Sequence, residues 1–283
     1  MHTKRMVRRS LREIARVCEG VGSRAAAAAD RLDETSIPAV SYPQNARFRD
    51  LHRGHRAFVI GNGPSLATQD LSPLQGELLF TMNAFDRHPL CRELRPAYHF
   101  LADPEVNENS PKQEAELARM GKGMPDSTMF VPAWPSIDSD TLRQWRATGR
   151  LFLVPIVGNL SLGPVTEFDM TTGLPAVQTV AQLALMTSVF MGCSPVYLMG
   201  VDSDWAASTD LDRHFYAERT LDESWDWQYE SILEASLTMF RGYRFLWDFC
   251  RTRNVEIYNC TAGGLLDVFP RKRFEEVVAD AGK

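Results

Sequence analysis

A glycine-rich turn is the first of five short polar features in this chain that could do chemistry. The run 58–66, Phe-Val-Ile-Gly-Asn-Gly-Pro-Ser-Leu, joins an apolar stretch to a turn made of Gly61, Asn62, Gly63, Pro64 and Ser65. Glycine lets the main chain turn tightly and approach a ligand, and the N–H groups at the start of a following helix attract anions. We therefore expect the turn to bind the phosphorylated end of a nucleotide-like ligand. The alternative is a tight strand-to-helix turn in which Ser65 is the cap.

This turn does not match two common nucleotide-binding motifs. Leu66 stands where a third glycine would complete G-x-G-x-x-G, and no G-K-[ST] follows. Neither a standard dinucleotide-binding fold nor a P-loop is therefore indicated.

Two further motifs offer neutral hydrogen-bonding groups. Asn83 follows the apolar run 78–82, and its amide could read a base or hold a sugar hydroxyl, or simply cap the next turn. Thr172 and Gly173 precede a long apolar stretch that is typical of a helix. They could contact a phosphate or a ribose, or act only as a helix cap.

An acidic pair ends another apolar run. Asp202 and Asp204 form a D-x-D motif, which could hold Mg²⁺ or Mn²⁺ against a diphosphate. Alternate residues of an extended chain point to opposite sides, so both carboxylates reach one ion only where the strand has ended. We favour a structural or substrate-orienting role for Asp202 and keep the metal site as the alternative.

His214 is the candidate catalytic group. It lies in a polar stretch after the acidic pair, followed by Phe215 and Tyr216. A histidine with a pKa of about 6.5 can take a proton at neutral pH, so we expect a general base here, the alternative being an ordinary surface histidine. No G-x-S-x-G elbow or Cys/His pairing indicates a hydrolase.

The elements that must position these groups alternate in type. Two stretches are typical of helices, 175–192 and 225–254, and seven short apolar runs are typical of buried parallel strands: 57–60, 78–82, 98–101, 128–131, 151–154, 196–199 and 255–258. This alternation predicts an α/β fold, doubly wound around a mainly parallel, Rossmann-like sheet. Ligands of such sheets bind at the carboxyl ends of the strands, where the polar motifs stand.

The chain divides into an unusual N-terminal segment and one domain. Residues 1–45 carry many arginines among apolar residues at helical spacing, which predicts a basic amphipathic helix and a linker. That helix is a solvated appendage or a contact between copies in a homo-oligomer, or it docks on anionic lipid through residues 1–24. Residues 46–283 form a single nucleotide-binding α/β domain, with candidate lids in 107–144 and 203–227.

Composition excludes several classes of function. The 283 residues carry a net charge of -5, which argues against a nucleic-acid partner, because such proteins are usually basic. The five cysteines form no C-x-x-C pair, which suits a reducing cytoplasm and argues against a zinc site or a disulfide framework. No apolar stretch is long enough to span a membrane and no signal peptide is visible, so we expect a cytoplasmic protein, peripheral at the inner face of the membrane if the N-terminal helix binds lipid.

The motifs together resemble a known family. In order and approximate spacing they are similar to the bacterial sialyltransferases of glycosyltransferase family 42, and equally to the MptE-like group related to 6-hydroxymethylpterin pyrophosphokinases. The resemblance covers about residues 56–275 and rests on 61–66, 82–83, 172–173, 197–202, His214 and 257–260, with the ending 258–270 typical of the MptE-like group.

The sialyltransferase resemblance implies a GT-A-variant fold and a set of roles. Asn62 and Asn83 would contact the CMP part of a CMP-activated donor, Thr172 would contact the donor, and His214 would deprotonate the acceptor hydroxyl. The implied reaction is inverting displacement at the anomeric carbon without an essential metal, with a sialic-acid-like sugar passing to a glycan, lipid-linked or protein acceptor in cell-surface polysaccharide biosynthesis.

One departure from the family bears on the leaving group. The sialyltransferases have tyrosines after this strand to hold the phosphate, whereas here Asp202 is followed by Ser203, Asp204 and Trp205. An acid would repel a phosphate unless a cation intervened, although Tyr216 could substitute for the tyrosines. The alternatives are therefore an Mg²⁺-dependent MptE-like pyrophosphokinase and a nucleotide-binding module without catalysis.

Overall fold

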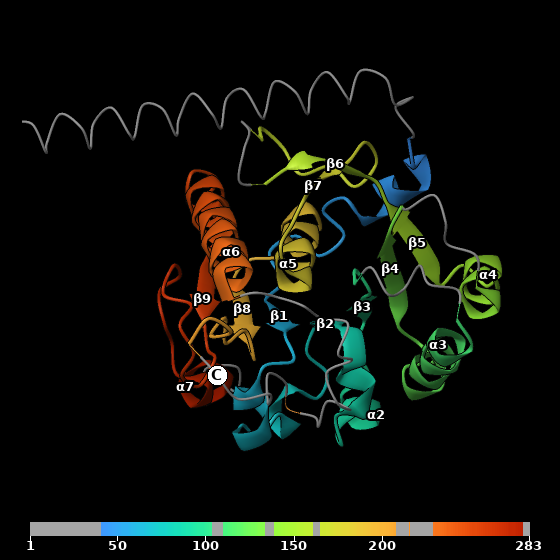
Figure 1. The fold of residues 1–283 in the computed structure, drawn as a ribbon, viewed down its shortest axis with the longest axis horizontal. Helices are drawn as coiled ribbons and strands as arrows, with labels where there is room; N and C mark the ends of the chain where they lie inside the picture. The colour runs from blue at the N-terminus through green and yellow to red at the C-terminus, as the bar shows by residue number, and fades with distance from the viewer. Residues whose placement is uncertain are drawn as a thin grey trace, which may run out of the picture.

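A seven-stranded parallel sheet forms the centre of the molecule. The computed structural model describes residues 41–103, 110–133, 139–160, 165–207, 215 and 229–279. The strands are β1 Ala57–Ile60, β2 Leu79–Met82, β3 Tyr98–Phe100, β4 Thr128–Pro132, β5 Leu151–Val154, β8 Val196–Met199 and β9 Ile257–Asn259. Their order is β5-β4-β3-β2-β1-β8-β9, and every neighbouring pair is parallel (Figure 1).

Helices cover both faces of this sheet. Described α-helices are α2 Cys91–Leu94, α3 Pro111–Gly123, α4 Asp140–Ala147, α5 Val180–Phe190, α6 Tyr229–Arg251 and α7 Phe274–Ala279. Short 3-10 helices are η1 Pro43–Phe48, η2 Pro64–Thr68, η3 Ser72–Leu74 and η4 Asn83–Arg87. The doubly wound α/β prediction is therefore confirmed, whereas residues 1–40 of the expected basic helix lie outside the described residues.

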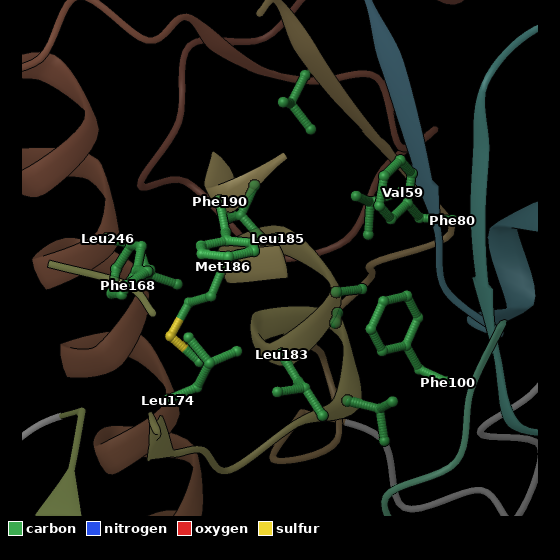
Figure 2. Close-up of a cluster of buried hydrophobic side chains, with 14 of the residues drawn as sticks. Val59, Phe80, Phe100, Phe168, Leu174, Leu183, Leu185, Met186, Phe190 and Leu246 are labelled. Atoms are coloured by element: carbon green, nitrogen blue, oxygen red, sulfur yellow. The ribbon is translucent and has the colours of Figure 1, made fainter. Parts of the chain in front are cut away.

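The alternation of side chains along β1 divides the core in two. Val59 packs with Phe80, Leu183 and Phe190 on the face covered by α5 and α6, as Figure 2 shows. Phe58 and Ile60 point to the opposite face, which α2, α3, α4 and α7 cover. Both faces of β1 are buried, which explains why its sequence is an unbroken apolar run.

One predicted helix begins later than expected. Residues 174–176 form strand β7, Leu174–Ala176, which pairs with β6, Ile156–Asn159, in a separate two-stranded sheet, and α5 starts only at Val180. Pro175 has no N–H to donate, and a two-stranded sheet accommodates this because each of its strands is an edge. The final strand is also shifted, to Ile257–Asn259 instead of 255–258.

The chain changes direction across the sheet between β1 and β8. From β1 it builds β2 to β5 outward on one side, and α5 then returns it to β8 on the other side of β1. Ligands of open α/β sheets bind at such a switch point, outside the carboxyl ends of the strands. Among the described residues no helix is both long and apolar enough to cross a membrane.

Candidate functional site

The glycine turn after β1 lies against the loop that follows β8. The N–H of Gly61 donates to Met199 O and that of Gly63 to Gly200 O, both at 2.8 Å. A Cβ on Gly61 would lie 2.3 Å from Gly200 O, and one on Gly63 would lie 1.7 Å from Oδ2 of Asp202. The close approach of these two loops at the switch point therefore requires both glycines.

The start of the short helix after this turn already has an anionic partner. Asp202 accepts a hydrogen bond from the main-chain N–H of Ser65 at 3.2 Å and another from its hydroxyl at 2.8 Å. Pro64 has no N–H to offer, and Leu66 N–H donates to Gly63 O at 3.2 Å. A protein carboxylate thus already accepts from both donors of Ser65, the last residue of the turn at which we expect the phosphorylated end of a ligand.

One carboxylate of the acidic pair is already engaged by the protein. Asp202 is 5% exposed and both of its carboxylate oxygens accept from Ser65. Burial raises the pKa of Asp202, the hydrogen bonds from Ser65 lower it, and the charge of Asp204 raises it. Within the described part of the chain no group of three or more His, Cys, Asp or Glu side chains could hold a metal. A cation at Asp202 would have to share that carboxylate with the two donors of Ser65.

Asn62 has a buried oxygen that no described residue uses. The residue is 7% exposed, and its Nδ2 donates to Met82 O at 2.9 Å, which connects the end of β1 to the end of β2. This contact fixes which end of the carboxamide is the oxygen. Oδ1 is buried and has no hydrogen-bond partner among the described residues.

Asn83 repeats this feature at the end of the neighbouring strand. It follows β2 directly with a φ of +48°, in the left-handed region that asparagine tolerates better than most residues. Its side-chain Oδ1 is likewise buried without a partner in the described ranges. Two carboxamide oxygens are thus left over at the carboxyl ends of two adjacent central strands.

The chemistry of these two oxygens limits what they can bind. A carbonyl oxygen only accepts hydrogen bonds, so it pairs with a hydroxyl, an amine or an N–H group. A phosphate at neutral pH offers mainly acceptors and would be repelled. Since a buried acceptor without a partner costs about 1–3 kcal/mol, the arrangement favours a ligand that brings donors, such as the sugar or the base of a nucleoside.

An aromatic cluster lies beside Asn62. The main-chain N–H of Phe215 donates to Asn62 O at 3.0 Å, and the Phe215 ring meets the edge of His88 with 5.4 Å between centroids. His88 stacks on Phe85, and burial lowers its pKa. His214 and Tyr216, the two sequence neighbours of Phe215, lie outside the described residues, so their roles stay predictions.

Thr172 and Gly173 belong to a different region. They lie in the turn 169–173, where Asp169 pairs with Arg49 at 2.9 Å, and the Arg49 guanidinium lies over the ring of Phe190 at the end of α5. Thr172 is exposed, and a Cβ on Gly173 would lie 2.4 Å from Val157. No described contact links this turn to Asn62 or Asn83.

Thr179, which we did not single out from the sequence, carries the hydroxyl that stands directly before α5. It is the N-cap residue of that helix, and its Oγ1 lies 3.1 Å from the hydroxyl of Tyr243 on α6. Tyr243 is fully buried, and burial raises its pKa to about 12 while hydrogen bonds to Thr179 and Ser203 lower it. A threonine directly before an apolar helical run is a common N-cap residue. Because we expected the helix to begin at Pro175, Thr179 fell inside the expected helix and was not considered as its cap.

Known proteins resemble this chain in shape only distantly. No protein-family description and no curated protein sequence matches it. Solved structures of the sialyltransferase CstII from Campylobacter jejuni align over most of the chain. The complex with CMP-3FNeuAc gives 13% identity and a TM-score of 0.45, covering 77% of this chain and 85% of that one. The complex with cytidine-5'-monophosphate gives 15% identity and 0.46 over the same shares. The complex with a trisaccharide acceptor and CMP gives 14% identity and 0.44, covering 76% and 85%.

Proposed function

We propose that this protein is a glycosyltransferase that binds a CMP-activated sugar at the carboxyl ends of β1 and β2. The observation that carries the proposal is the pair of unpartnered side-chain oxygens on Asn62 and Asn83. They lie where a Rossmann-like sheet binds nucleotides, and the family 42 sialyltransferases, which the motifs resemble, use asparagines at these two positions for CMP. The sugar is sialic-acid-like or related, and the acceptor is a hydroxyl of a glycan, a lipid-linked precursor or a protein.

The two asparagines hold the nucleoside part of the donor in this proposal. Each Oδ1 accepts a hydrogen bond from a ribose hydroxyl or from an amine of the base, because those groups are donors. The carboxylate of Asp202 keeps the phosphate away from the glycine turn by like-charge repulsion. Asp202 itself holds the β1 and β8 loops together through Ser65, and the phosphate lies away from this carboxylate.

His214 is the general base of the proposed reaction. It takes the proton from the acceptor hydroxyl as that oxygen attacks the anomeric carbon, and the bond from that carbon to the phosphate oxygen breaks with inversion. The electron pair of the broken bond leaves with CMP. Support comes from the chain connection, since Phe215, the next residue, donates to the main chain of Asn62.

A pyrophosphokinase of the MptE-like type has less support. That reaction depends on Mg²⁺, and one carboxylate of the acidic pair that would hold the ion, that of Asp202, already accepts two hydrogen bonds from Ser65. A nucleotide-binding module without catalysis would use the same two asparagines. Only a measurement of sugar-transfer activity distinguishes such a module from a transferase.

A ligand screen followed by one substitution tests the proposal. We expect CMP and CMP-sugars to raise the melting temperature more than UDP or ATP with Mg²⁺, because a ligand that binds the folded state stabilises it by mass action. His214→Ala should abolish sugar transfer and leave CMP binding intact, with His55→Ala, a histidine at the opposite end of β1, as the matched control. Selective stabilisation by ATP with Mg²⁺ would contradict the proposal. Full transfer activity in His214→Ala would remove the base role.

A further inference from the structure

The outer side of α6 carries a row of exposed apolar side chains. Tyr229, Leu233 and Leu237 are 58%, 45% and 51% exposed, and their four-residue spacing places them along one side of the helix. The opposite side of α6 faces α5, where Gln182 Nε2 donates to Met239 O at 2.9 Å (Figure 1). The packing of α6 on the domain therefore does not use the exposed row.

Trp205 extends this apolar surface beyond the helix. Its side chain is exposed, and the Tyr229 hydroxyl donates to the main-chain oxygen of the next residue, Ala206, at 2.7 Å. Single exposed apolar residues are ordinary, whereas a contiguous group with a polar border indicates an interaction surface, and aromatic residues are enriched at the centre of protein interfaces. We call Trp205, Tyr229, Leu233 and Leu237 the α6 patch.

Four charged side chains border the α6 patch in a regular order. Glu230 and Glu234 come before Leu237 on the helix, and Arg241 and Arg244 come after it. All four are exposed, and none of them forms an ion pair with another described residue. One half of this side of α6 is therefore acidic and the other half is basic, with the leucines at the centre.

We propose that the α6 patch is the contact surface of a homodimer in which α6 of one copy lies antiparallel to α6 of the second. A two-fold axis at Leu237 brings together residues that stand equally far before and after it. Glu230 and Arg244 stand seven residues before and after Leu237, and Glu234 and Arg241 stand three before and four after. With a rise of about 1.5 Å per residue, each acid therefore faces a base of the second copy.

The apolar side chains match under the same symmetry. Leu237 meets its own equivalent at the two-fold axis. Leu233, four residues before it, faces the partly buried Phe240, three residues after it. At 3.6 residues per turn, Leu233 and Phe240 lie on one flank of the row, and Glu234 and Arg241 lie on the other. The antiparallel arrangement thus pairs apolar side chains with each other and acids with bases.

A second copy fits this surface better than the other occupants do. An anionic lipid surface attracts arginines and repels acids, so Glu230 and Glu234 would oppose its binding. Residues 1–40 carry more basic than acidic side chains, and Arg241 and Arg244 would repel them. A second α6 offers both signs of charge in the required order.

Two charge reversals test the antiparallel pairing directly. Glu234→Arg and Arg241→Glu should each weaken the dimer roughly tenfold or more, because like charges then face each other at two symmetric places. An equimolar mixture of the two variants should form heterodimers about as tightly as the natural chain dimerises, since every reversed side chain then faces an opposite charge. Sedimentation equilibrium on the full chain measures these dissociation constants.

A third variant tests the centre of the α6 patch. Leu237→Lys places two cations at the two-fold axis, so it should raise the dissociation constant of the dimer roughly a hundredfold. Leu51→Lys is the matched control, because Leu51 is also 51% exposed and lies outside the patch, and it should leave the constant unchanged. Circular dichroism checks that both variants are folded, as expected for substitutions at exposed positions.

Four results would overturn the proposal. A natural chain that stays monomeric at every concentration tested would reject the dimer, and a dimer that persists in Leu237→Lys would form through another surface. A mixture of the two charge reversals that forms no heterodimer would reject the antiparallel pairing. Binding of the natural chain to phosphatidylglycerol vesicles that is lost in Leu237→Lys, without any dimer in solution, would assign the patch to lipid. None of these measurements involves a nucleotide or sugar transfer, so their outcome is independent of the proposed function.

Discussion

The carboxylate of Asp202 holds both the main-chain N–H and the hydroxyl of Ser65, at 3.2 and 2.8 Å. This contact joins the loop after β1 to the loop after β8 across the switch point of the sheet. Leu265 N–H also donates to the main-chain oxygen of Asp202, at 2.7 Å, so a third loop is tied to the same residue. Asp202 is therefore the centre of the framework beneath the candidate site.

Removing the hydroxyl of Ser65 should destabilise the fold. We expect Ser65→Ala to lower the free energy of unfolding by about 1–3 kcal/mol, because the buried carboxylate of Asp202 loses the hydrogen bond from the Ser65 hydroxyl. Urea denaturation followed by circular dichroism measures the change. Ser72→Ala, which removes an exposed hydroxyl that donates to Asp70 at 2.8 Å, is the matched control and should cost less than Ser65→Ala. Equal costs at the two positions would contradict the central role of Asp202.

The ionisation of Asp202 should leave a signature in the pH dependence of stability. Burial raises the pKa of this carboxyl, so the folded state binds its proton more readily than the unfolded chain does. Stability due to this group should fall as pH rises from the unfolded pKa, about 3.9, through the raised folded pKa, and then stay constant. The difference in unfolding free energy between the natural chain and Asp202→Asn isolates this group. A difference that grows in favour of the natural chain over that interval would mean that the pKa is lowered instead.

Two glycine substitutions distinguish the stability cost of a steric clash between loops from the cost of backbone strain. Gly63→Ala should cost about 3 kcal/mol, because the new Cβ would lie 1.7 Å from Oδ2 of Asp202. Gly76→Ala is the control: its φ is +84° with nothing within 4 Å, so it should cost only the conformational strain of about 1–2 kcal/mol. The denaturant midpoints of the two variants measure these losses of stability. A smaller loss of stability in Gly63→Ala than in Gly76→Ala would show that the loops after β1 and β8 separate easily.

Much of the fold could be predicted from the sequence, because strands buried on both faces consist of short runs of consecutive apolar residues. The run Ala57-Phe-Val-Ile60 became β1 without a shift in either boundary. The separate sheet of β6 and β7 was missed, since Pro175 and the nearby apolar residues read equally well as the first turn of a helix. Residues 174–176 form a strand because they pair with a segment 18 residues away, as the register Ile156↔Leu174 shows. A local sequence pattern does not indicate a pairing partner at that distance.

The candidate site was predictable in its residues and less so in their roles. Gly61, Asn62, Asn83 and Asp202 were singled out by type and position, and the fold brings them to neighbouring strand ends. The contact of Asp202 with Ser65 spans 137 residues of sequence, so nothing local showed that a carboxylate would accept the hydrogen bonds of Ser65.

The donor groups of the ligand, rather than its phosphate, should determine what Asn62 and Asn83 contribute to binding. We expect Asn62→Ala and Asn83→Gly each to weaken CMP binding by about threefold to tenfold, since a typical hydrogen bond contributes about 0.5–1.5 kcal/mol. Glycine is chosen at position 83 because alanine would add strain at a φ of +48°.

The affinity of each variant should fall by the same factor for cytidine as for CMP, because the two oxygens accept hydrogen bonds from the nucleoside. Calorimetric titration of both ligands measures the factors, with Asn254→Gly, another left-handed asparagine, as the control at a φ of +57° outside the site. A loss seen with CMP and absent with cytidine would place the phosphate at the asparagines and reject this reading of the site.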